Sequence, residues 1–62
     1  MRTAEPERIR VKLLPQSTEQ AIADLVSDGE AFHIYLDEFS GGIQIAFRRA
    51  DGTVAIIEPV IT

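Results

Sequence analysis

His33 is the only histidine in the chain and the side chain best able to exchange protons near neutral pH. Asp37 shares its side of a predicted strand, but four residues of extended backbone separate the two side chains by about 13 Å. A catalytic hydrogen bond cannot span that distance. The chain also has no cysteine, no glycine-rich phosphate loop and no regular spacing of metal ligands. We therefore predict that the protein is not an enzyme and binds no metal and no cofactor.

Most carboxylates fall in one stretch of the chain. Residues 13–47 contain six Asp and Glu and no Lys or Arg, and the whole chain has a net charge of −4. Asp24 and Asp28 lie about 6 Å apart along a predicted helix. Asp28 and Glu30 lie at the C-terminal end of that helix, where the helix dipole disfavours anions. The stretch is therefore either a solvated face or an anionic surface that docks on a cationic protein.

A predicted turn gives this anionic surface a second part. Phe39 lies at the turn, between acidic residues and glycines. An aromatic side chain ringed by charge is typical of the residues that dominate protein interfaces; alternatively, Phe39 folds back over the edge of the sheet. The candidate partner-binding residues are Asp24, Asp28, Glu30, Asp37, Glu38 and Phe39.

The scaffold for these residues follows from hydrophobic periodicity. Residues 8–13 alternate basic and apolar side chains, as a half-buried strand does. Ser17 and Gln20 have the spacing of a capping box at the start of a helix over residues 18–28, and Gly29 supplies a left-handed residue to end it. Three further strands are predicted at residues 31–39, 42–49 and 53–58.

The predicted order of elements is βαβββ. We therefore expect an α+β fold in which one helix packs on a four-stranded, mostly antiparallel sheet. Residues 1–7 are predicted to form a flexible tail, and residues 8–62 a single domain. Since the helix runs back along the sheet, the first strand should be parallel to the second. It lies beside either the second or the fourth strand.

Two short turns set the predicted register of the sheet. We place two-residue turns at Ser40-Gly41 and at Asp51-Gly52, because Asp-Gly between alternating strands favours a tight hairpin. The first turn pairs Phe47 with Ile34, and the second pairs Phe47 with Ile56. These apolar side chains are then expected to lie under the helix.

The face opposite the helix is predicted to carry a partly apolar row. With the register above, this row consists of Tyr35, Ala46 and Ile57. Exposed faces of antiparallel sheets are usually polar. The row is therefore either a few tolerated surface residues or an interface for a homodimer or a partner protein.

Composition limits the partners and the compartment. The acidic balance argues against direct binding of nucleic acid, which depends on Lys and Arg, and favours a basic protein partner. No apolar run approaches the roughly 20 residues of a membrane helix, and the first residues lack the apolar stretch of a signal peptide. Together with the absence of cysteine, this predicts a cytoplasmic protein.

In its small size, its single α+β domain and its acidic stretch at residues 13–47, the chain resembles the small acidic inhibitors of phages and mobile elements, including anti-CRISPR proteins. The resemblance is at the level of the class, without a shared motif. It implies a non-enzymatic inhibitor that mimics nucleic acid and occludes a basic, nucleic-acid-handling partner such as a CRISPR-Cas effector subunit. The alternative is a structural, assembly or antitoxin-like subunit that binds through the outer face of its sheet.

Overall fold

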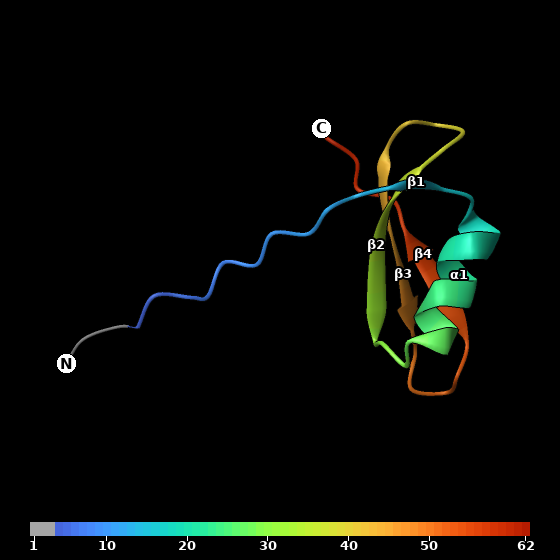
Figure 1. Ribbon diagram of the computed structural model, residues 1–62, viewed down its shortest axis with the longest axis horizontal. Coiled ribbons are helices and arrows are strands. Elements are labelled where there is room, and N and C mark those ends of the chain that lie inside the picture. Colours follow the sequence, from blue (N-terminus) through green and yellow to red (C-terminus); the bar gives the residue numbers. More distant parts are fainter. Residues whose placement is uncertain (1–3) are drawn as a thin grey trace.

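The computed structural model describes residues 4–62. One helix packs on a sheet of four strands in the order β1-β2-β3-β4 (Figure 1). β1 is parallel to β2, and the other neighbours are antiparallel. The predicted α+β fold is confirmed, and the first strand lies beside the second. The elements are β1 (Pro15–Gln16), α1 (Thr18–Ser27), β2 (Phe32–Asp37), β3 (Ile43–Arg48) and β4 (Val54–Ile57).

The predicted first strand is wrong. Residues 8–13 have no strand partner, and residues 4–14 run away from the fold as an arm (Figure 1). β1 begins only at Pro15, and its contact with β2 rests on the N–H groups of Leu36 and Glu38, which donate to the carbonyls of Leu14 (3.4 Å) and Gln16 (3.0 Å). Alternation shows that a segment can be half-buried, but not which surface buries it. Residues 1–3 of the predicted tail lie outside the described residues.

The helix begins where its cap predicts. Ser17 has an extended backbone, and its hydroxyl accepts a hydrogen bond from the backbone N–H of Gln20 at 3.1 Å. This bond satisfies one of the free N–H groups of the first turn. At the other end Gly29 has a φ of 66°, the left-handed conformation expected of a residue that stops a helix. Ala21 and Leu25 form the buried stripe of the helix.

The first hairpin has a longer turn than predicted. Asp37 and Gly42 close it, since the N–H of Asp37 donates to the carbonyl of Gly42 at 2.8 Å. The Asp37 carboxylate accepts a hydrogen bond from the N–H of Ser40 at 2.9 Å, which organises the four residues between. Ile34 therefore pairs with Ile45 instead of Phe47. This slide by two residues keeps every side chain on its predicted face of β2 and β3.

The second hairpin also differs from its prediction, by one residue. Arg49 and Thr53 close a three-residue loop, with the N–H of Arg49 donating to the carbonyl of Thr53 at 2.8 Å. Gly52 has a φ of 91°, as in three-residue loops that end in a left-handed residue. Phe47 consequently pairs with Ala55 and not with Ile56. A slip of one residue moves every side chain of β4 to the other face.

The helix covers the face of the sheet opposite to the one predicted. Tyr35 and Ala46 are fully buried and pack against Ala21 and Leu25 of α1. The prediction that Tyr35 and Ala46 lie on the outer face is therefore wrong. Ile57 is 45% exposed and does lie on the face away from the helix.

We call that outer surface the open face. Side chains of a strand alternate between the two faces, so the strand pairings place eight residues on it. They are Phe32, Ile34 and Leu36 of β2, Ile43, Ile45 and Phe47 of β3, and Ala55 and Ile57 of β4.

Candidate functional site

The face under the helix is rich in polar groups, which form a network. The side-chain amide of Gln16 donates to the carboxylate of Asp24 at 2.7 Å, and its carbonyl oxygen accepts from Nε2 of His33 at 2.9 Å. All three side chains are half-buried. The network ties β1 to the helix and to β2. His33 and Asp24 thus both have Gln16 as a hydrogen-bond partner.

Tyr35 is the centre of a second group under the helix. Its hydroxyl donates to Oε1 of Gln44 at 2.7 Å and accepts from the hydroxyl of Thr18 at 3.0 Å. Its ring stacks on His33 with 6.3 Å between centroids. A buried tyrosine with both hydrogen-bonding roles filled is stable in this position. The hydroxyl of Tyr35 thus ties the helix to β2 and β3.

The open face has the opposite character. None of its eight residues carries a charge or a hydrogen-bonding side chain. Phe32 is 57% exposed, Ile43 50% and Ile57 45%, and the other five are half-buried. The largest apolar patch on a protein surface is often a functional one. The open face is the strongest candidate for a binding surface in the described part of the chain.

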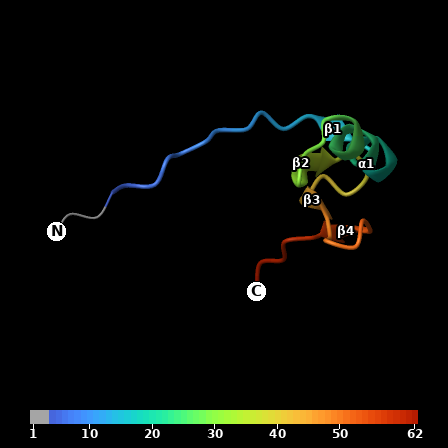
Figure 2. The same cartoon turned by 90° about the horizontal axis from the view of Figure 1, so that it is seen from below.

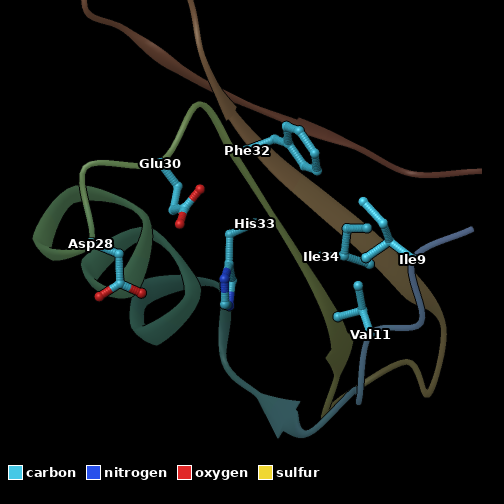
Figure 3. A pocket seen from close by; sticks show the side chains of 7 residues that line it. All are labelled: Ile9, Val11, Asp28, Glu30, Phe32, His33 and Ile34. Carbon is cyan, nitrogen blue, oxygen red and sulfur yellow. The ribbon is translucent and has the colours of Figure 1, made fainter. Parts of the chain in front are cut away.

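The arm borders this face at the edge of β2. Ile9 and Val11 lie beside Ile34, and together with Phe32 they form the apolar side of a groove of about 380 Å³ (Figure 3). Asp28 and Glu30 line the other side of the groove, on the helix side of β2 (Figure 3). The groove therefore has one apolar wall and one acidic wall. Its apolar wall extends the open face beyond the sheet.

The predicted acidic surface is divided into two groups. Asp28 and Glu30 are exposed near the start of β2, whereas Glu38 and Phe39 are exposed beyond its end. Eight residues of largely extended chain put Glu30 and Glu38 more than about 20 Å apart. Phe39 is 84% exposed and does not fold over the sheet edge.

Two of the predicted acidic residues have structural partners. Asp37 is only 7% exposed, and its carboxylate holds the turn through Ser40. Asp24 is half-buried and bound to Gln16. The structure does not bring the six predicted partner-binding residues into one patch.

Most of the open face was predicted to lie inside the core, because the more apolar face of a sheet usually meets the helix. No sequence signal distinguishes the two faces. The narrow buried stripe of the helix, with Ala21 and Leu25 buried and Val26 56% exposed, becomes visible only in the structure. A stripe of that size covers little apolar surface.

No protein-family model matches this chain, and no curated protein matches it in sequence. Within residues 4–62 there is no cluster of three or more acidic or histidine side chains suited to a metal ion. Among the described residues, no helix is both long enough and hydrophobic enough to cross a membrane. The geometry of the open face is thus the main guide to function.

Proposed function

We propose that this chain is a non-enzymatic protein-binding subunit that works through its open face. The single observation that carries the proposal is the contrast between the two faces of one sheet. Seven of the eight open-face residues are large aliphatic or aromatic side chains, whereas the fully buried hydrophobic residues are Ala21, Leu25, Tyr35 and Ala46. Val54 and Ile56 pack against this core, and the open face still carries more large apolar side chains than the fully buried core does.

The total surface supports this reading. The accessible area is 5395 Å², whereas a compact protein of 6.9 kDa has about 4,000 Å². The chain thus exposes about 1,400 Å² more than a compact protein of its mass, and the extended arm is part of this excess (Figure 1). A chain of this size without a disulfide gains stability when a partner covers such a surface.

A matched pair of substitutions tests the proposal. Ile43 on the open face is 50% exposed and Val26 on the helix is 56% exposed, so replacing either by Lys costs a similar amount of buried area. Tagged protein should retain its partner through a high-salt wash, because apolar contacts are not screened. Ile43→Lys should abolish retention and Val26→Lys should preserve it. Equal retention by both variants contradicts the proposal.

The acidic inhibitor is a second candidate, favoured by the exposure of Asp28 and Glu30 and by the absence of a basic residue in the last helical turn. An anionic surface of this kind speeds association with a basic, nucleic-acid-handling protein. Reversal by Asp28→Lys with Glu30→Lys should then slow association and flatten its salt dependence. A partner that is lost at high salt, competed by DNA or RNA and unaffected by Ile43→Lys favours this candidate over the first.

A further inference from the structure

We propose that the partner covering the open face is a second copy of this chain. The inference rests on the proposed function and adds the identity of the occupant. In a two-fold dimer each patch meets its own copy, so a net charge on the patch is repelled by the same net charge on the other copy. The eight open-face side chains are uncharged. The guanidinium of Arg49 lies 6.0 Å from the ring centroid of Phe47, and the exposed acids Asp28, Glu30 and Glu38 lie outside the face. It is the described surface best suited to self-association.

The open face alone is smaller than a standard protein interface. Three strands about 4.8 Å apart and six residues long span roughly 14 × 20 Å, or about 300 Å² in projection. This is less than the approximately 800 Å² that a standard interface takes from each partner. Two stacked sheets about 10 Å apart therefore need further contacts. The arm can supply them.

The arm leaves the fold on the same side of the sheet as the open face. Both ends of the described chain leave the fold on the side away from the helix (Figure 2), which is where a stacked second copy sits. Ile9, Val11 and Leu14 of the arm are 75%, 53% and 59% exposed. Eleven residues of extended chain reach at most about 36 Å, enough to lie across the facing sheet. The arm of each copy therefore adds apolar surface to the interface.

Charge supports the same arrangement. Arg8, Arg10 and Lys12 alternate with the apolar residues of the arm, so in extended conformation they lie on its other side. The groove beside β2 has an acidic wall formed by Asp28 and Glu30. An arm that lies in this groove of the other copy sets its apolar side against the apolar wall and its basic side against the acidic wall. Each chain thus carries both halves of a complementary pair.

Sedimentation of the purified full-length chain tests the inference. We expect a species of twice the 6.9 kDa chain mass, which dissociates on dilution from near-millimolar to micromolar concentration. Val26→Lys should leave the dissociation constant unchanged. Ile43→Lys should give a monomer across the whole range. A wild-type monomer at every concentration, or a dimer that Ile43→Lys does not weaken, overturns the inference.

The arm is tested without disturbing the folded part. Ile9→Asn with Val11→Asn removes two side chains that are mostly exposed in the single chain, so circular dichroism should be unchanged. Because each loses apolar burial in the dimer, the dissociation constant should rise at least about tenfold. An unchanged constant overturns the role of the arm.

The two proposals fail in different ways. If the chain is a monomer but Ile43→Lys abolishes retention of another protein, the second copy is wrong and the protein-binding function stands. If Ile43→Lys changes neither sedimentation nor retention, both are wrong.

Discussion

The two faces of the sheet differ in polarity, and the face that is open to solvent is the less polar one. The face covered by α1 carries His33, Tyr35, Asp37 and Gln44, whose polar groups are satisfied by hydrogen bonds. The face open to solvent has only apolar side chains. A burial pattern of this kind fits a sheet that is the middle layer of an assembly. Hydrophobicity alone therefore does not show which face of a sheet the chain itself buries.

The largest effect on folding should come from the small core under the helix. Leu25 is fully buried, and truncation of such a leucine costs about 3 kcal/mol. A 62-residue chain has a total stability of roughly 3–9 kcal/mol, so Leu25→Ala should remove between about a third and all of it. Urea denaturation followed by circular dichroism measures this. Val26→Ala, at a 56% exposed position, is the control and should cost far less; equal costs would argue against this core.

The polar network should contribute less than the apolar core. Tyr35→Phe removes the hydroxyl that joins Thr18 to Gln44 and leaves their oxygens without this partner, at a cost of about 1–2 kcal/mol. Adding Gln44→Leu removes one of the two stranded groups. The double variant should then recover part of the lost stability in the same urea experiment. The network would be contradicted if the double variant lost more free energy of unfolding than the two single variants lose together.

The loop that sets the face of β4 gives a smaller effect. Gly52 has a φ of 91°, and a Cβ there meets no atom within 4 Å. Gly52→Ala is therefore disfavoured by backbone conformation alone, at about 1 kcal/mol. Gly42→Ala is the matched control, because its Cβ meets only the Ser40 hydroxyl at 3.5 Å, an ordinary contact, and its φ is not in the left-handed region. Similar midpoints for both variants would argue against the three-residue loop.

The side chains of β2 and β3 that share a face could be predicted from the sequence, whereas the face of β4 could not. Alternation in β2 and β3 correctly groups Phe32 with Ile34 and Ile43 with Ile45, because a strand has a period of two. The capping of α1 at Ser17 is a local signal and is also confirmed. The face of β4 depends on one extra loop residue. Asp-Gly favours a two-residue loop, but its glycine also suits the left-handed last position of a three-residue loop, which Gly52 occupies here.

The candidate site was harder to predict than the fold. Its position depends on which side of the sheet the helix occupies, and apolar content suggested the wrong side. Ile57 alone of the three predicted outer residues lies on the open face. A chain that forms an interface through its most apolar face cannot be distinguished by composition from one that buries this face internally.

The smallest expected effect is on the titration of Asp51 in the same loop. The hydroxyl and N–H of Thr53 donate to its carboxylate and lower the pKa of Asp51 below the ordinary value of 3.8. The stabilisation is therefore present above pH 3.8 and is lost as the pH falls through the lowered value. Thr53→Val removes the hydroxyl and should raise the pKa of Asp51 in an NMR titration. A pKa that does not move contradicts this contact.

The helix packs on the face of Tyr35 and Ala46 and leaves the face of Ile34 and Ile45 open. Nuclear Overhauser effects from the Leu25 methyl groups distinguish these two faces. We expect cross-peaks to the ring of Tyr35 and the methyl of Ala46, which pack with Leu25 in one cluster. Cross-peaks from Leu25 to Ile34 and Ile45 instead would place the helix on the other face and overturn this arrangement.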